Sequence, residues 1–215
     1  MTLAIANRFP SVQIQGQVVR HSINWEMDKL PMTMIMCDLV DSTRLVTSLS
    51  TEDFSLLLLD YYAVCFSRIE RWQGQVIRYV GDGVLGLFDE DEKPQRLAER
   101  AIRAGIELRD SISEMPVTSR SLGTAKLAVR VSVVSGIGIK ACLHGLSDSN
   151  QKVVFSQIPF LADRLKGWTT PNSIVICEQT AHLAGNNCRL ENLGIMRLKG
   201  FPEVVTAWRV LDLIT

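Results

Sequence analysis

Two aspartates, each placed at the end of an apolar segment, are the feature that most constrains this chain. Residues 32–37 (MTMIMC) form a short apolar run that predicts a buried strand, and Asp38 follows at its C-terminal end. Residues 75–79 and 84–88 predict two strands joined by a tight Gly-Asp-Gly turn that contains Asp82, because a DG pair between apolar runs is typical of a β-hairpin. The fold therefore has to present one carboxylate at a strand end and another at a hairpin turn.

The remaining periodicity places helices around these strands. Apolar residues recur at helical spacing within 51–73 and again within 94–112, and residues 126–135 predict a long strand. Strand–helix–strand–strand–helix–strand is the ferredoxin-like split βαβ order, which predicts an α+β fold with an antiparallel-rich sheet covered by helices. A helix at 155–166 and further strands at 173–177, 188–198 and 204–211 extend this core toward the C-terminus.

Composition excludes several classes of protein. The 215 residues suffice for one ordinary core, and 23 basic residues balance 23 acidic ones. Without a basic excess we expect neither a nucleic-acid nor a membrane-surface binder. Five cysteines without a CxxC pair, and a start that lacks the features of a signal peptide, predict reduced thiols and a cytoplasmic location. Residues 1–31 are interpreted as an N-terminal extension or dimer arm, and residues 32–215 as the catalytic domain.

The two aspartates suit a metal site if the fold brings them together. Strand ends on one edge of a sheet converge, and two neighbouring carboxylates repel each other unless a cation lies between them. A hard ion such as Mg²⁺ or Mn²⁺ takes oxygen ligands and commonly accompanies phosphate. The segment after Asp38 links a strand to a helix, where backbone N–H groups suit a phosphate. Each feature also has an ordinary interpretation, since Asp is common in turns and at helix caps.

The combination of motifs resembles the catalytic domain of class III adenylate and guanylate cyclases. Residues 36–43 (MCDLVDST) resemble the first metal motif of that family, and residues 78–88 (RYVGDGVLGLF) resemble the second. Residues 161–165 (LADRL) are similar to the helix that carries the family's transition-state arginine, and residues 198–201 (LKGF) are similar to its closing hairpin. The resemblance implies the cyclase catalytic fold, with extra C-terminal strands.

Carried onto this sequence, the resemblance implies a two-metal mechanism. Asp38 and Asp82 would hold two Mg²⁺ or Mn²⁺ ions per site, with help from the backbone of Leu39. The 3′-hydroxyl of a nucleoside triphosphate would attack the α-phosphorus in line and expel pyrophosphate.

The same resemblance assigns further roles along the chain. Arg164 would stabilise charge that builds on the α-phosphoryl group, and Lys199 would contact the outer phosphates. The phosphate cradle would consist of Val40, Asp41, Ser42 and Thr43. Family members place the metal half of each site on one chain and the arginine half on the other, so a homodimer with sites at its interface is implied.

Three positions of the family's base and ribose pocket carry unusual residues. Arg78 stands where the family's adenylate cyclases have Lys and its guanylate cyclases have Glu. Val153 aligns with a second base-contacting position, and Phe160 aligns with the asparagine that orients the ribose. Arginine only donates hydrogen bonds, so it suits the O4 acceptor of uracil better than the amino group of cytosine or adenine. Bulky Tyr79 and Phe160, if they line the pocket, would favour a small pyrimidine.

These features predict a uridylate cyclase that resembles the stand-alone pyrimidine cyclases of bacterial anti-phage defence. Cyclic UMP would then act as a second messenger for a separate effector protein. Two alternatives remain open from the sequence. One is a cytidylate, adenylate or guanylate cyclase, and the other is a catalytically inactive nucleotide-binding regulatory domain.

Overall fold

The computed structural model describes residues 12–14, 17–19, 24–90, 93–119, 123–144 and 151–214. The contacts divide the chain into two units. The first unit comprises Met1–Leu30 and Ile137–Gln157, and the second comprises Pro31–Gly136 and Ile158–Thr215. Every candidate site residue except Val153 belongs to the second unit.

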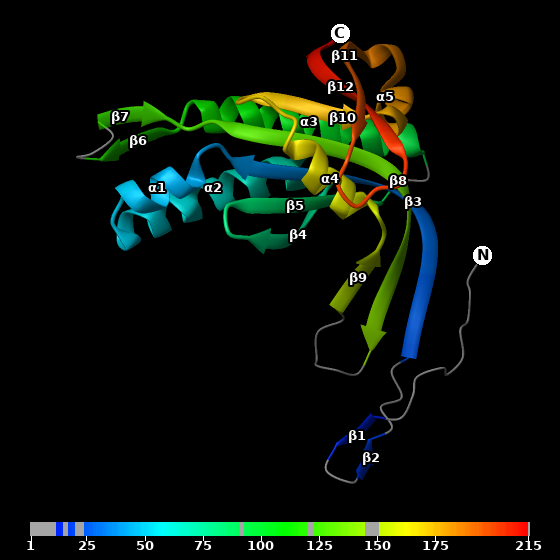
Figure 1. The fold of residues 1–215 in the computed structure, drawn as a ribbon. Helices are drawn as coiled ribbons and strands as arrows, with labels where there is room; N and C mark the ends of the chain where they lie inside the picture. The colour runs from blue at the N-terminus through cyan, green and yellow to red at the C-terminus, as the bar shows by residue number, and fades with distance from the viewer. Residues whose placement is uncertain are drawn as a thin grey trace. The chain divides into compact units, whose positions relative to one another are not determined.

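Runs of strands and helices follow one another along the chain, and Figure 1 labels them in chain order. The strands are β1 Val12–Ile14, β2 Gln17–Val19, β3 Asn24–Leu39, β4 Gln75–Val80, β5 Gly83–Phe88, β6 Pro116–Ser119, β7 Gly123–Lys126, β8 Val129–His144, β9 Gln151–Phe155, β10 Ser173–Cys177, β11 Cys188–Arg197 and β12 Val204–Leu213. The helices are α1 Ser42–Ser48, α2 Thr51–Arg71, α3 Pro94–Ser113, α4 Ile158–Lys166, α5 Glu178–Ala184 and the short 3₁₀ helix η1 Gly185–Asn187.

The second unit is built on a sheet with the strand order β11-β12-β10-β8-β3-β5-β4. β10 runs parallel to β8, whereas β3–β5, β4–β5, β10–β12 and β11–β12 are antiparallel. β3 and β8 also run in opposite directions, since Thr33 Oγ1 bonds to Ser135 Oγ and Val40 N donates to the carbonyl oxygen of Ala128. The predicted α+β fold with an antiparallel-rich sheet is therefore confirmed.

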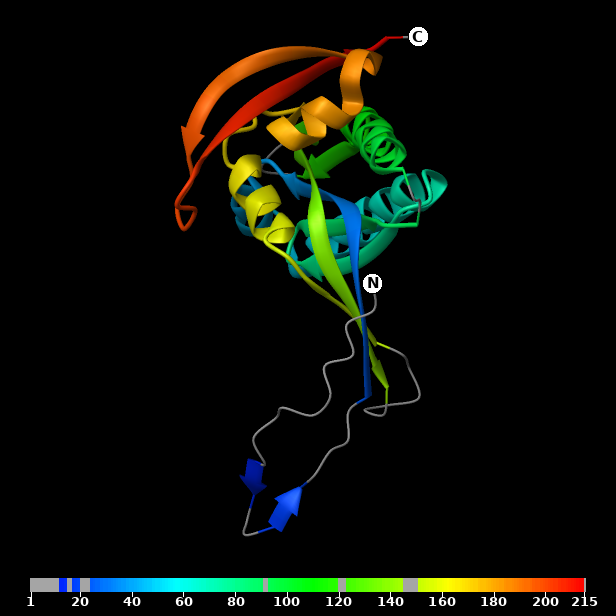
Figure 2. The same ribbon diagram turned by 90° about the vertical axis from the view of Figure 1, so that its right-hand side faces the viewer.

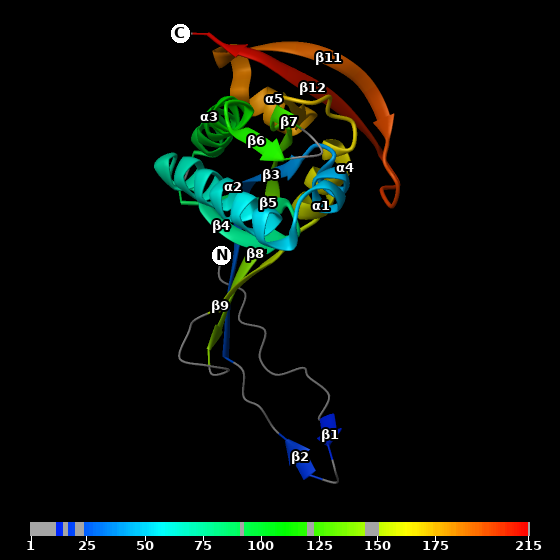
Figure 3. The ribbon, with the colours of Figure 1, turned by 90° about the vertical axis from the view of Figure 1, so that its left-hand side faces the viewer.

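One face of this sheet packs against α2 and α3. Ile35, Cys37 and Leu39 alternate along β3 and join the same buried core as Val84 and Phe88 of β5. In Figures 2 and 3, which look along the sheet from opposite sides, α2 and α3 lie on one side of the strands and α4 lies on the other. The side chains between the core positions of β3, including Asp38, therefore point toward the side of the sheet that carries α4.

α4 is fixed to its face of the sheet by buried contacts. Ile158, Ala162 and Leu165 are buried, and Ser132 Oγ of β8 donates a 2.7 Å hydrogen bond to the carbonyl oxygen of Ala162. The buried residues recur at intervals of three and four, as expected for a helix that packs one side on a sheet.

In the first unit, β9 pairs antiparallel with β8 from Ile139 to Leu143, and β1 pairs antiparallel with β2. The sequence placed a helix start at residue 155, but that residue ends β9 and α4 begins at Ile158. The hairpin of β6 and β7 was not predicted. No helix in the described ranges has the length and apolar character needed to cross a bilayer.

Candidate active site

Asp38 and Asp82 come together although the chain separates them by more than forty residues. Asp38 precedes the last residue of β3, and Asp82 occupies the turn between β4 and β5. The backbone N–H of Leu39 donates a 3.1 Å hydrogen bond to Asp82 Oδ2, which ties the turn to the end of β3. The two carboxylates predicted to share a site are neighbours in this structure.

Asp38 is a largely buried carboxylate with both a cation and a second carboxylate beside it. Burial raises the pKa of Asp38 above its ordinary value, Lys166 acts to lower that pKa, and Asp82 acts to raise it. Only 16% of the Asp38 side chain is exposed to solvent. A divalent ion between two such carboxylates would remove their repulsion.

The donor set around this pair suits magnesium or manganese. Asp38 and Asp82 supply carboxylate oxygens, and the carbonyl of Leu39 adds an oxygen donor on the same strand end. In the described part of the chain, no group of three or more His, Cys, Asp or Glu side chains is arranged to hold a metal ion by itself. Mg²⁺ commonly uses one or two carboxylates and completes its shell with waters and substrate phosphates, so the residues present fit that ion.

The turn that carries Asp82 is anchored to α2. Gly81 has a left-handed φ of 57°, a conformation that glycine adopts at little cost. The hydroxyl of Tyr62 donates to the carbonyl oxygen of Gly81, and the rings of Tyr62 and Tyr79 lie 4.6 Å apart. The aromatic pair therefore fixes the hairpin tip, and with it the position of Asp82.

A β-bulge determines which way Arg78 points. Val76 pairs with Gly86, but Arg78 pairs with Leu85, so Ile77 is an extra residue without a partner in the ladder. Residues directly opposite each other share a face, and an extra residue shifts every following side chain to the other face. Without the bulge, Arg78 would lie opposite the core residue Val84.

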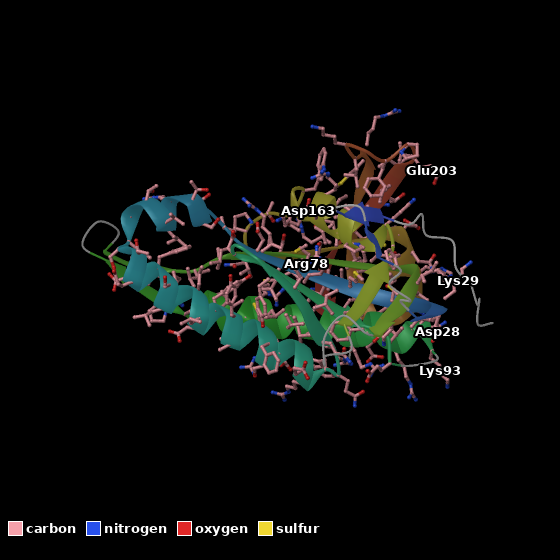
Figure 4. The ribbon with its side chains drawn as sticks, turned by 90° about the horizontal axis from the view of Figure 1, so that it is seen from below. Asp28, Lys29, Arg78, Lys93, Asp163 and Glu203 are labelled. Atoms are coloured by element: carbon pink, nitrogen blue, oxygen red, sulfur yellow. The ribbon has the colours of Figure 1, made fainter. Side chains whose placement is uncertain are left out.

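With the bulge in place, Arg78 lies on the sheet face that carries Asp38. Leu85 pairs with both Arg78 and Met36, which places these three residues in one row across the sheet. Asp38 comes two residues after Met36 on β3, so it lies on the same face. Arg78 is exposed and makes no ion pair or hydrogen bond within the described part of the chain; it is labelled in Figure 4. Tyr79, by contrast, packs against Tyr62 of α2 and so lies on the other face from Arg78.

The predicted phosphate cradle is smaller than expected. The N–H of Leu39 is used by Asp82, and the N–H of Val40 donates to Ala128 with a length of 2.8 Å. Asp41 caps α1 in a left-handed conformation with φ 56°. The N–H groups of Ser42 and Thr43, in the first turn of α1, have no acceptor inside the helix. Val40 therefore cannot offer its amide to a phosphate as the sequence suggested.

α4 carries Arg164 and Phe160 on its outward side. The two residues are four apart and so share one side of the helix, where Phe160 is 69% exposed and the Arg164 side chain is 48% exposed. Arg164 binds its neighbour Asp163 at 3.0 Å. Among the described residues, no contact joins Arg164 or Phe160 to the aspartate pair of the same chain.

Lys166 lies beside Asp38, a contact that was not predicted from the sequence. Its Nζ lies 3.1 Å from Asp38 Oδ1 and 3.3 Å from Asp163 Oδ1. Burial opposes its charge, but the Asp38 and Asp163 carboxylates raise the pKa of Lys166 above the usual lysine value. Lys166 follows Arg164 by two residues, so the two side chains lie on different sides of the helix. This spacing was the only feature of the sequence that could have pointed to Lys166.

Two further predicted residues lie away from this cluster. Lys199 follows β11 in an exposed turn in which the N–H of Phe201 donates to the carbonyl of Leu198, and it forms no ion pair in the described part of the chain. Val153 lies on β9 in the first unit and pairs with Ala141 of β8. Its side chain lies outside the described residues.

A strand end and a hairpin turn thus bring two carboxylates together close to the start of α1. The adenylate and guanylate cyclase catalytic domain family matches residues 26–211. The chain belongs to this family of class III nucleotide cyclases.

One known relative matches this chain in sequence over part of its own length, and solved cyclase structures match it in fold. An uncharacterized protein of Rhizobium meliloti is 29% identical over 180 residues, which covers 83% of this chain but only 17% of that relative's length. The crystal structure of the guanylyl cyclase Cya2 aligns with a TM-score of 0.77 at 24% identity, over 86% of this chain and 94% of that one. The adenylyl cyclase CyaB from P. aeruginosa aligns with a TM-score of 0.76 at 22% identity, over 87% and 96%.

Proposed function

We propose that this protein is a nucleotidyl cyclase that converts UTP to 3′,5′-cyclic UMP and pyrophosphate. The observation that carries the proposal is the layout of one sheet face. The Asp38 carboxylate and the free guanidinium of Arg78 project from this face with two strand spacings, about 10 Å, between their strands. This separation is comparable to that between the phosphates and the base of a nucleotide.

Each predicted site residue then has a role in the reaction. Asp38, Asp82 and the Leu39 carbonyl would hold two Mg²⁺ or Mn²⁺ ions, which polarise phosphate oxygens and favour ionisation of the ribose 3′-hydroxyl. The free N–H groups of Ser42 and Thr43 would bind outer phosphate oxygens. These contacts would orient the α-phosphate for attack by the 3′-oxygen, with pyrophosphate as the leaving group.

The outward direction of Arg164 supports a homodimer in which each chain completes the site of the other. Arg164 makes no contact with the carboxylates of its own chain, yet an arginine near the α-phosphate would stabilise the charge that develops there. Phe160 shares the outward side of α4, so it would enter the second chain's site together with Arg164 and stack near the base or ribose. Lys199 from the closing hairpin would add a cation for the outer phosphates.

Base choice rests on the chemistry of Arg78. Its guanidinium has only donors, and the neighbouring Leu85 and Met36 are apolar and offer no carboxylate or amide oxygen. Uracil presents the O4 acceptor at this edge, whereas cytosine and adenine present an amino group. Action on CTP or on a purine triphosphate is the second candidate, because the matched solved structures are named adenylyl and guanylyl cyclases. A role of the product as a defence signal read by a separate effector rests on the family resemblance alone.

The test is to incubate the purified protein with Mn²⁺ and with ATP, GTP, CTP or UTP in separate reactions and to identify cyclic products by mass. Cyclic UMP as the dominant product, absent from an Asp38→Ala control, is the expected result. Dominant cyclic CMP, AMP or GMP would retain the cyclase activity and overturn the base assignment. No cyclic product from any triphosphate, with nucleotide binding intact, would favour the inactive regulatory domain.

A further inference from the structure

We propose that Lys166 is the resting counter-ion of the metal site: its ammonium neutralises Asp38 while no metal is bound, and metal binding transfers it to Asp163. The inference rests on the proposed metal site at Asp38 and Asp82. It concerns how the chain stabilises that site before metal and substrate arrive.

The first step is the position of the ammonium group. Lys166 Nζ lies 3.1 Å from Asp38 Oδ1, within hydrogen-bonding distance of an oxygen proposed to bind metal. The exposed fractions of the two side chains are only 22% and 16%, so water screens this pair less than it screens a surface ion pair. Lys166 and an ion bound at Oδ1 would therefore compete for the same carboxylate.

The second step is the presence of an acceptor for the displaced lysine. Asp163 lies one turn before Lys166 on α4, and its Oδ1 is 3.3 Å from the same Nζ. The Asp163 side chain is 41% exposed and also binds Arg164 through Oδ2. Lys166 can leave Asp38 by side-chain rotation alone, with no change in the helix. A divalent ion at Asp38 would repel the ammonium and favour this transfer.

The third step is the consequence for affinity. Two partly buried carboxylates without a counter-ion would bind a divalent ion tightly and would also repel each other in its absence. Lys166 removes part of that repulsion, but each arriving ion must displace it. The chain should therefore bind free metal more weakly than its two carboxylates alone would allow.

The experiment measures Mn²⁺ binding by electron paramagnetic resonance, without nucleotide, on the full chain. Lys166→Gln should tighten Mn²⁺ binding about tenfold, since it removes one positive charge beside the ion and keeps a hydrogen-bonding side chain. Lys166→Arg keeps the charge and should retain the weaker affinity. Asp163→Asn should weaken Mn²⁺ binding several-fold, because the displaced lysine loses its acceptor. Circular dichroism checks that each variant is folded.

Asp38→Asn separates failure of this inference from failure of the metal site. If Asp38→Asn binds Mn²⁺ as the unaltered chain does, both the proposed metal site and the proposed role of Lys166 are wrong. If Asp38→Asn abolishes binding but Lys166→Gln leaves it unchanged or weakens it, the site stands and the counter-ion role is wrong. An unchanged Mn²⁺ affinity with a raised KM for the triphosphate would instead make Lys166 a substrate contact.

Discussion

The two faces of the sheet in the second unit differ in packing density and in the charge of their side chains. The face against α2 and α3 is apolar and tightly packed: a Cβ added to Gly86 would meet Ile35 Cγ2 at 2.8 Å and Ile69 Cδ1 at 2.9 Å. The face that carries α4 holds the half-buried charges of Asp38 and Lys166 and the free guanidinium of Arg78. Adjacent residues of one strand thus serve packing and chemistry separately, because side chains alternate along a strand.

This comparison predicts that substitutions on the two faces will have different effects. Changes on the α4 face should lower activity and leave stability nearly intact, whereas changes on the α2–α3 face should lower stability first. Variants that violate this separation would show that the two faces are coupled through the strands.

The largest effect is expected for Asp38→Ala and Asp82→Ala. Loss of a metal ligand removes several kcal/mol of transition-state stabilisation, so turnover should fall about a thousandfold or more. Steady-state assays of cyclic nucleotide formation measure this change, and thermal unfolding should show a folded chain. Activity within tenfold of the parent in either variant would refute the metal assignment.

Arg164→Ala should lower turnover about a hundredfold, as expected for loss of one charge-stabilising donor. An equal mixture of Arg164→Ala and Asp38→Ala chains should recover about one quarter of parental activity, since half of the dimers are mixed and each mixed dimer has one intact site. Native mass spectrometry confirms that subunits exchange. Mixed dimers without recovered activity would show that Arg164 does not act across an interface.

On the opposite face, Gly86→Ala should lower the free energy of unfolding by about 2 kcal/mol through overpacking. Gly105→Ala, in α3, is the matched control, because its Cβ would meet its nearest neighbour, Val131 Cγ1, at 3.3 Å and alanine favours the helix. Urea unfolding measures both variants. Equal stabilities for the two would contradict the tight packing around Gly86.

Arg78→Lys and Arg78→Glu should shift the ratio of kcat/KM between UTP and the other triphosphates about tenfold, with stability changed little. Tyr79→Phe, one residue away on the other face, serves as the control and should leave the ratio intact. Competition assays with pairs of triphosphates report the ratio directly. An unaltered ratio in both Arg78 variants would remove Arg78 from the base site.

The smallest effect is expected for Tyr62→Phe, which removes the hydrogen bond to Gly81 and should cost about 1 kcal/mol of stability. Because that bond anchors the turn that holds Asp82, Mn²⁺ affinity should fall together with stability. Urea unfolding and Mn²⁺ titration on the same sample test the link. Lost stability with unchanged metal binding would show that the turn keeps its form without Tyr62.

The sequence predicted most helices and strands and the aspartate pair because local signals specify them, but it missed the β6–β7 hairpin. An apolar run before Asp38 predicts a strand end, and a Gly-Asp-Gly sequence around Asp82 predicts a tight turn, each from a few neighbouring residues. The use of the Val40 amide by Ala128 and the contact of Lys166 with Asp38 depend on partners far along the chain. The orientation of Tyr79 depends on the bulge at Ile77, and isoleucine is not a residue that indicates a bulge in the sequence.

That bulge also has an evolutionary consequence. Because Ile77 is a single surplus residue in β4, loss of its codon would restore plain alternation and leave Arg78 opposite Leu85 and Tyr79 opposite Val84. Both side chains would therefore keep their faces. Evolution can thus shorten this strand by one residue at Ile77 without exchanging the side chains that its two faces present.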